Sequence, residues 1–276
     1  MRHLSEQPGV PGTGPPVANP FDAVASTLRE EVLAHCERNG IDLEGRAGWN
    51  TLETNSGFTE RRGAPLMKMA LERLKAPSLA GLRVLDVGCG FGALSVFFAF
   101  NGATVTGIDV NAGRLEVGRR TAERHGLDIE LETQSMVDQA LPDGSFDIAV
   151  MNNSLCYLAE RELQLRALRA ARAALTPGGV LVTRNPNRLH PIDQFTGVPL
   201  LNLLSPHKAV KVAARLGRRR SLCRLVSPRR ARRELRESGF AGVVHHRNRP
   251  GWPPRPKLLT RYSHFTALRP EVRPLP

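Results

Sequence analysis

Apolar residues follow two patterns along this chain: short continuous runs, and stretches in which they recur at helical spacing. The short runs are typical of buried strands. They lie at 83–87, 103–108, 129–131, 146–151 and 180–183. The stretches with helical spacing lie between them, at 92–100, 111–125 and 160–175. Strands that alternate with helices predict a parallel, doubly wound α/β sheet.

Amphipathic patterns also precede this core. Residues 21–39 and 65–75 have the apolar spacing of helices, and Gly40 is a typical stop for the first of them. Residues 41–61 are mostly polar and are predicted to be irregular. The polar, Pro- and Gly-rich segment 1–20 is expected to be disordered.

The pattern changes after the fifth predicted strand. Residues 186–207 contain four prolines in mixed apolar and polar sequence, which is too long for an ordinary connection. Ser227-Pro228 is a typical N-cap and N1 pair and predicts a helix that ends at Ser238. Residues 240–246 and 262–268 are predicted to be two last strands, whereas Thr176–Gly179 is predicted to be a turn.

These patterns divide the chain into five segments. We expect a disordered tail at 1–20, an N-terminal helical cap at 21–78, a nucleotide-binding core at 79–185, a lid and basic insertion at 186–226, and the completion of the sheet at 227–276.

Three glycines on alternate positions follow the first strand: Gly88, Gly90 and Gly92. A glycine lacks Cβ, so the backbone can bend tightly and approach a ligand closely, and the next helix points free N–H groups at the same place. The pattern also fits the dinucleotide fingerprint. However, Asp86 stands two residues before the first glycine, where it would repel a pyrophosphate and attract a cationic amine. NAD is therefore disfavoured.

A second carboxylate, Asp109, ends the second strand. In this position behind a glycine turn, an acid can accept both hydroxyls of a ribose. The alternative is an aspartate that only turns the strand into a loop, and the glycine turn favours the ribose interpretation.

The segment from Asp86 to Gly92 (Asp-Val-Gly-Cys-Gly-Phe-Gly) resembles motif I of the class I S-adenosylmethionine (SAM) dependent methyltransferases. The stretches 141–147 and 175–181 resemble further motifs of that family, in its order and spacing, so the resemblance covers about residues 64–184. It implies a Rossmann-like sheet of seven strands with the last strand antiparallel, N-terminal helices, a lid insertion after strand five, and SAM as the cofactor.

The resemblance also implies roles for single residues. Asp86, Gly88 and Gly90 would hold the methionine end of SAM, and Asp109 the ribose. Met136 and Val137 stand where the family contacts adenine, and Asn152 where backbone meets the ligand amine. Gln134-Ser-Met136 departs from the family pattern, because it lacks the acid and small residue often found there.

Methyl transfer to a hydroxyl is helped by a base. His190 is the leading candidate, with Asp193 three residues later as the side chain that orients it; both follow the fifth strand, at the edge where ligands bind in such sheets. The alternative is an ordinary loop histidine. Tyr157 and His207 are weaker candidates. No metal is expected, since the ends of strands four and five offer Asn152, Asn153 and Asn185 (neutral amides) in place of carboxylates.

The formal net charge of +13 is concentrated in residues 208–236, which hold twelve Lys or Arg and one acid, Glu234. Such a segment could grip RNA phosphates, rest on an anionic membrane surface beside the apolar stretch 198–204, or form a solvated helix, which is the favoured interpretation. It contains no aromatic residue for base stacking. Asn152-Asn-Ser-Leu155 also lacks the N-P-P-aromatic motif of amino-directed DNA methyltransferases.

Four scattered cysteines without a C-x-x-C pair predict reduced thiols in a cytoplasmic protein. The leading hypothesis is a SAM-dependent methyltransferase acting on a small or medium organic acceptor, with oxygen as the favoured atom. The alternatives are an RNA methyltransferase that uses the basic segment and a non-catalytic SAM-binding module.

Overall fold

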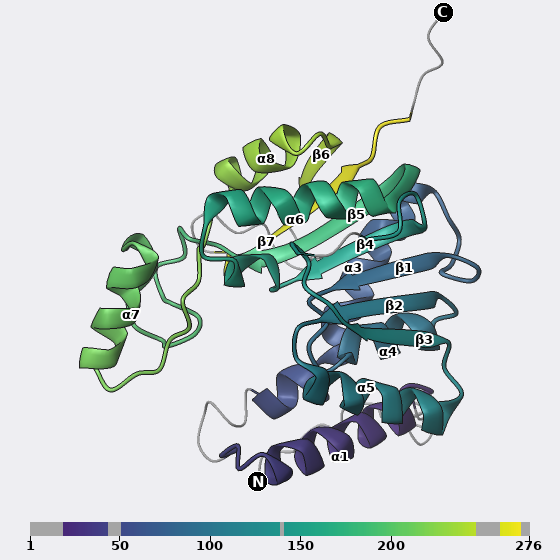
Figure 1. Ribbon diagram of the computed structural model, residues 1–276, viewed down its shortest axis with the longest axis horizontal. Coiled ribbons are helices and arrows are strands. Elements are labelled where there is room, and N and C mark those ends of the chain that lie inside the picture. The colour runs from purple at the N-terminus through teal and green to yellow at the C-terminus, as the bar shows by residue number, and fades with distance from the viewer. Residues whose placement is uncertain (1–18, 44–50, 139–140, 247–259, 272–276) are drawn as a thin grey trace, which may run out of the picture.

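The computed structural model describes residues 19–43, 51–138, 141–246 and 260–271, so most of the predicted disordered tail lies outside the described residues. Within them seven strands form one sheet in the order β3-β2-β1-β4-β5-β7-β6 (Figure 1). The strands are β1 Arg83–Val87, β2 Thr104–Asp109, β3 Ile129–Thr133, β4 Phe146–Asn152, β5 Leu175–Pro186, β6 Ala241–His246 and β7 Tyr262–Leu268. Strands β1 to β5 pair in parallel, and β7 is antiparallel to β5 and β6. The predicted sheet is confirmed.

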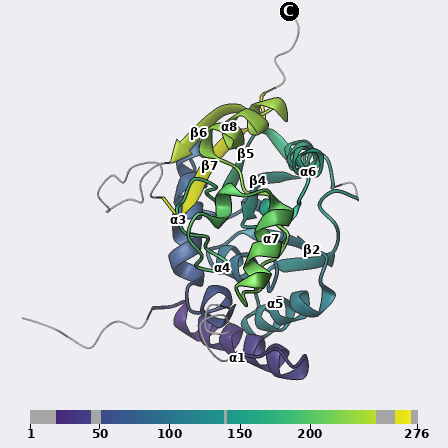
Figure 2. The same ribbon diagram turned by 90° about the vertical axis from the view of Figure 1, so that its left-hand side faces the viewer.

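Helices cover both faces of the sheet, as Figure 2 shows for α3 and α4 on one side and α6 on the other. The main helices are α1 Asp22–Arg38, α3 Thr59–Leu74, α4 Ala93–Phe100, α5 Ala112–His125, α6 Arg161–Ala174, α7 Pro206–Arg215 and α8 Pro228–Glu237. Because strand side chains alternate between faces, Val180 and Val182 of β5 join the core under α3 and α4, while Leu181 joins the core under α6 and α8.

The second N-terminal helix begins earlier than predicted. The sequence prediction placed it at 65–75, but α3 starts at Thr59 and carries Pro65 inside it. Tight packing explains the extension: Thr59 is fully buried, and a Cβ on Gly63 would lie only 2.3 Å from the Phe97 ring on α4. Residues 51–55 are also helical, in a segment predicted to be irregular.

The turn predicted at Thr176–Gly179 is part of strand β5. Phe146 pairs with Leu175 and Ile148 with Val180, so four residues of β5 bulge opposite one residue of β4. The bulge is held by β7 and its extension, since Gly178 N donates to Arg269 O at 3.0 Å and Arg269 N to Gly179 O at 2.9 Å. The motif thus bends a strand without ending it.

The segment between β5 and α8 forms a lobe of its own. It contains the short 3-10 helix η2 (Leu201–Leu203) and α7, which had no predicted helix of its own. In Figure 1 α7 lies beyond the ends of the strands, and in Figure 2 it stands in front of that edge. Helix α8 begins as predicted, with Ser227 as the N-cap and Pro228 at N1. Among the described residues, no helix is long and apolar enough to cross a bilayer.

Candidate cofactor and acceptor site

The glycine turn lies at the carboxyl end of β1, in the middle of the sheet. Gly88, Gly90 and Gly92 all have positive φ angles, of 71°, 62° and 72°. Such angles are strained for a residue with a side chain. The N–H groups of Gly88 and Cys89 donate to the Ile108 carbonyl at 2.8 and 3.0 Å, which ties the turn to β2.

Gly88 and Gly90 differ in the space around them. A Cβ on Gly88 would lie 2.4 Å from Ser154 Cβ and 3.2 Å from Met136 Cε, so this glycine is packed against the loops after β3 and β4. A Cβ on Gly90 would meet no atom within 4 Å. The turn therefore presents bare backbone to open space at Gly90, which is the surface that a closely approaching ligand requires.

Asp109 stands beside that open backbone. Its Oδ2 accepts from Gly90 N at 2.9 Å, and its Oδ1 accepts from Asn111 N at 3.0 Å, where Asn111 in turn caps α5. The residue is half-buried. Each carboxylate oxygen keeps a further acceptor site, so the two oxygens are fixed in place and remain able to accept from a diol.

Asp86 lies behind the turn and is only 2% exposed. Burial is the main reason that the pKa of its carboxyl is raised, to about 6. The Asp109 charge acts in the same direction, while a hydrogen bond from Ser95 Oγ at 2.9 Å and the Arg62 charge oppose the rise. A cation placed next to this buried carboxylate would stabilise its ionised form, which the surrounding groups compensate only weakly.

Sequence reasoning missed two arginines at this edge, the half-buried Arg62, whose charge acts on Asp86, and the buried Arg184. Arg62 of α3 donates to the backbone carbonyls of Phe58 and Thr54, and burial, with the charge of Arg184, lowers its pKa to about 10. Arg184 of β5 donates to Asn152 Oδ1 at 3.1 Å and stacks 3.5 Å over the Tyr262 ring. Arg184 had a visible signal, because an arginine is unusual at the end of a buried strand.

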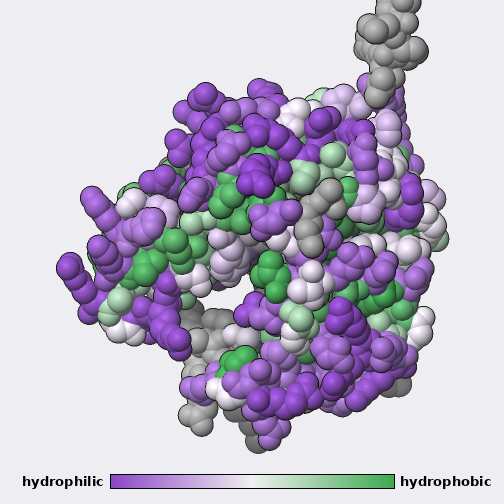
Figure 3. Space-filling model, viewed as in Figure 1, coloured by the Kyte–Doolittle hydropathy of each residue, from purple (hydrophilic) through white to green (hydrophobic). Residues whose placement is uncertain are grey.

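The glycine turn follows β1, and Asp109 ends β2 at the same edge of the sheet. Figure 3 shows a gap between the lobe that carries α7 and the lobe of α1 and α5. The gap lies at the edge of the sheet where β1, β2, β4 and β5 end, which is where ligands bind in open α/β sheets.

A family model described as a methyltransferase domain matches residues 84–179, the segment that contains this turn and the two carboxylates. These residues belong to the class I SAM-dependent methyltransferases.

Curated relatives match part of the chain. A ubiquinone biosynthesis O-methyltransferase of Actinobacillus pleuropneumoniae is 39% identical over 119 residues, which is 41% of this chain and 50% of that protein. The chain thus spans about half the length of this relative.

The solved structures extend the similarity in fold to most of the chain. A SAM-dependent methyltransferase from Mesorhizobium loti has a TM-score of 0.54 at 24% identity, covering 83% of this chain and 100% of its own. The 1,6-didemethyltoxoflavin-N1-methyltransferase of Burkholderia thailandensis has a TM-score of 0.56 at 20% identity, covering 94% of both chains. At these identities the likeness concerns the fold.

The remaining predicted cofactor residues of the methyltransferase domain lie around the turn. Met136 packs toward Gly88, and Gln134 N donates to Asp109 O at 3.0 Å, which holds the 134–137 segment beside β2. The carbonyl of Val137 accepts from Arg166 Nη2 at 2.7 Å. Asn152 ends β4, and its side chain is engaged by Arg184.

Three buried polar atoms in the described residues lack a hydrogen-bond partner at the ends of β4 and β5. They are Asn153 Oδ1, Ser154 Oγ and Asn185 Oδ1. Unsatisfied buried polar atoms are uncommon in folded proteins. Of the three, Ser154 packs against Gly88 of the glycine turn.

The predicted pairing of His190 with Asp193 is wrong. Asp193 is fully buried, and its carboxylate accepts from Thr196 Oγ1 at 2.7 Å and from Arg220 Nε at 3.4 Å. His190 Nδ1 instead lies 2.7 Å from Ile192 O. Asp193 is drawn away because a nearby arginine and its own Asx-type turn satisfy it better than the imidazole. Ile192 N also lies 3.2 Å from Nδ1, so both backbone polar groups of Ile192 hold this ring nitrogen.

Sequence reasoning also missed that two distant cysteines meet. Cys156, just after β4, and Cys223, in the lid, are both buried in one cluster with Leu225. Within the described ranges, no group of three His, Cys, Asp or Glu is placed to hold a metal ion.

Proposed function

We propose that this chain is a SAM-dependent methyltransferase that transfers a methyl group to an oxygen of a small organic acceptor. The observation that carries the proposal is the bare backbone at Gly90 beside the fixed carboxylate of Asp109. The family match over residues 84–179 supports the same reading.

The residues around the turn fit SAM. The amino-acid end of SAM carries an ammonium and a carboxylate. The Asp86 carboxylate would pair with the ammonium, and Arg62 of α3 with the carboxylate. Asp109 would accept from the ribose hydroxyls, and Met136 and Val137 would flank the adenine. We also propose that Asn152 contributes backbone contacts to the ammonium.

SAM, when bound, supplies a methyl group that is already activated by the sulfonium. The chain then has to align the acceptor and exclude water. We propose that the lobe after β5 closes the acceptor side, and that His190 Nε2 accepts the proton of the hydroxyl. In this version the Ile192 carbonyl orients the imidazole in place of Asp193.

Oxygen as the methylated atom is supported by the O-methyltransferase relatives of the core. An RNA acceptor is less well supported, because Arg220 and Arg224 of the basic segment are paired internally with Asp193 and Glu234. We further propose that 21–78 is a helical cap, 79–185 the SAM-binding core, 186–226 the lid and 227–276 the completion of the sheet, and that the protein is cytoplasmic.

Calorimetric titration with SAM, S-adenosylhomocysteine and NAD tests the cofactor. We expect micromolar binding of both SAM ligands and none of NAD. Asp109→Ala should weaken binding at least about a hundredfold, because it removes two hydrogen bonds to a charged acceptor. Asp128→Ala, at the other edge of the sheet where Asp128 accepts from Thr104, is the matched control and should bind normally.

Methyl transfer is then tested with labelled SAM and a panel of small phenols, amines and RNA. Label on phenols that decreases in His190→Ala supports the full proposal. Binding without label on any acceptor would support the non-catalytic SAM-binding module, and absence of binding would overturn the cofactor assignment.

A further inference from the structure

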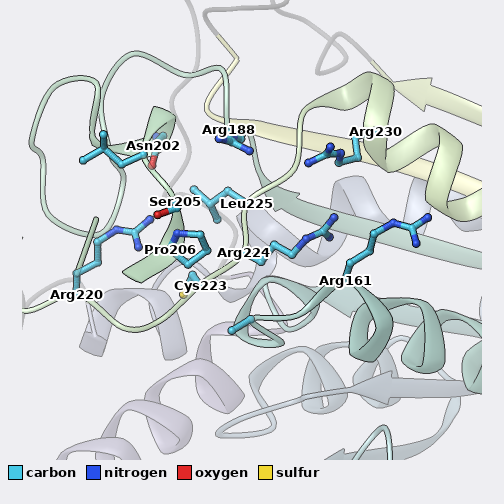
Figure 4. A pocket seen from close by; sticks show the side chains of 12 residues that line it. Arg161, Arg188, Asn202, Ser205, Pro206, Arg220, Cys223, Arg224, Leu225 and Arg230 are labelled. Atoms are coloured by element: carbon cyan, nitrogen blue, oxygen red, sulfur yellow. The ribbon is translucent and has the colours of Figure 1, made fainter. Parts of the chain in front are cut away.

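A second cavity lies between the lid, α6 and α8, on the far side of the Cys223–Val226 segment from the β4 loop. Its volume is about 300 Å³. Five arginines contribute to its walls, as Figure 4 shows. They are Arg161, Arg188, Arg220, Arg224 and Arg230. Nothing in the proposed methyl transfer uses this cavity.

The arginines carry more charge than their partners neutralise. Arg220 pairs with Asp193, and Arg224 with Glu234, at N–O distances of 3.4 and 2.6 Å. Arg161 pairs with Glu234 and Glu237. Among the described residues, no carboxylate lies within 4.0 Å of the guanidinium of Arg188 or of Arg230. Arg188 donates to the Leu203 carbonyl at 3.1 Å and Arg230 is exposed, so both positive charges of the cavity wall lack a carboxylate counter-ion.

Arg161 is held by the two acids of α8. It lies 3.7 Å from Glu234 and also contacts Glu237. This pairing keeps its side chain at the cavity mouth, where Figure 4 shows it opposite Arg230. The acids thus position the arginines, and they leave Arg188 and Arg230 to face the cavity.

Three helices also begin at this cavity. Arg161 is the first residue of α6, Pro206 the first of α7, and Arg230 lies in the first turn of α8. Each helix has at least ten residues. The amino end of a helix carries a partial positive charge and favours anions, so the three dipoles add to the charge of the arginines.

One buried acceptor completes the wall. Asn202 is 3% exposed, and its Nδ2 donates to His190 O at 3.1 Å, which fixes the orientation of the amide. Its Oδ1 is buried and has no partner. An unsatisfied acceptor in a cationic cavity calls for a ligand that also brings a hydroxyl or another donor.

We propose that this cavity binds a phosphate monoester of a small organic molecule. The two unpaired arginines match a dianion, and arginine suits the planar recognition of phosphate oxygens. A volume of about 300 Å³ lies at the lower end of small-molecule sites and has room for an organic part beyond the phosphate itself. Asn202 Oδ1 would accept from a hydroxyl on that part.

Calorimetric titration of the full chain with inorganic phosphate and phenyl phosphate, at constant ionic strength, tests the site. We expect both to bind, whereas phenol does not. Arg230→Gln should weaken phosphate binding about tenfold, as expected for the loss of one charge-assisted hydrogen bond. Arg188→Gln should do the same. Arg229→Gln, the neighbouring arginine of α8 that does not line the cavity, should change the dissociation constant less than twofold.

The source of the phosphate is tested by repeating the titration with S-adenosylhomocysteine and by offering hydroxyphenyl phosphate with labelled SAM. Label on this compound assigns the phosphate to the acceptor, and binding without label assigns it to a separate ligand of the same cavity. No phosphate binding by a protein that binds S-adenosylhomocysteine would overturn the proposal and leave the methyltransferase function intact. Equal binding by wild type, Arg230→Gln and Arg188→Gln would overturn it as well.

Discussion

The cofactor edge and the lid of this protein are built in opposite ways. At the cofactor edge, the site comes from three left-handed glycines and two carboxylates, Asp86 and Asp109, which the pairing of parallel strands fixes in place. In the lid, position depends on charged side chains. The only strand-like pairings there among the described residues are the isolated bridges Asn187–Val226 and Ile192–Pro199. The first region is placed by the sheet and the second by ion pairs.

At the cofactor edge, the pairing of β1 with β2 is enough to bring the glycine turn and Asp109 together. Asp86 stands opposite Gly107 and Val87 opposite Ile108, so the turn and Asp109 are in register from the start. Two buried carboxylates anchor the lid: Asp193, which pairs with Arg220 inside it, and Glu234 of α8. Glu234 is 2% exposed and binds Arg224 at 2.6 Å, while Arg224 also donates to Gln164 of α6. We therefore expect the lid to lose more stability than the cofactor edge when a charged side chain is removed.

Glu234→Gln should have the largest effect on stability. It removes the buried charge that compensates Arg224 and Arg161, and breaking a buried pair costs about 3–5 kcal/mol. At roughly 2–4 °C per kcal/mol for a chain of this size, we expect the melting temperature to fall by about 6–20 °C in calorimetry. Glu162→Gln, which breaks the exposed pair with Arg169, should cost less than 1 kcal/mol. Equal losses in both variants would contradict the role given to burial.

The sequence predicted the cofactor edge well for the same physical reason. Short apolar runs and a glycine pattern determine local backbone, and the register of parallel strands carries Gly88 and Asp109 to one edge. Boundaries were less accurate where tertiary packing decides them, as at Thr59, where the fit of Gly63 against Phe97 extends α3 past a proline.

The lid could not be predicted to the same extent, because its contacts join residues far apart in sequence. Asp193 is three residues from His190, yet Arg220, 27 residues later, binds it. Likewise, nothing local indicates that Arg62 of α3 faces the carboxylate of β1. A charge run gives the number of cations and not their partners.

The glycine turn offers a test with two neighbouring positions. Gly88→Ala combines a left-handed φ with a Cβ 2.4 Å from Ser154 Cβ, so it should cost about 2–4 kcal/mol. Gly90→Ala has the same kind of φ but open space around it, so it should cost only about 1 kcal/mol. Chemical denaturation measures both.

In ligand affinity we expect the opposite order, with Gly90→Ala affected more than Gly88→Ala. Gly90→Ala places a methyl group where we propose that the cofactor approaches, so S-adenosylhomocysteine should bind at least about tenfold more weakly to a protein that remains folded. If Gly90→Ala binds as tightly as wild type, the ligand does not lie against this part of the turn, and the comparison between edge and lid loses its functional meaning.

Asp86 gives the most specific effect, a pH dependence. Its folded pKa of about 6 lies above the unfolded value of about 3.9. The native state therefore binds more protons between these values, and the contribution of Asp86 to stability decreases as pH rises from about 4 to about 6. Asp86→Asn should lack this contribution. The free energy of unfolding of wild type should therefore fall relative to that of the variant across that pH window, and the difference should stay constant at higher pH.

Ligand binding should depend on the same proton with the opposite sign. If the ionised carboxylate of Asp86 binds the ammonium of the cofactor, S-adenosylhomocysteine must compete with a proton below pH 6. Its dissociation constant should then rise about tenfold between pH 7 and pH 5. Asp86→Asn, which keeps an acceptor for the Ser95 hydroxyl, should bind more weakly at pH 7 and show little change with pH. A wild-type profile as flat as that of the variant would mean that Asp86 supports the turn through its hydrogen bond and not through its charge.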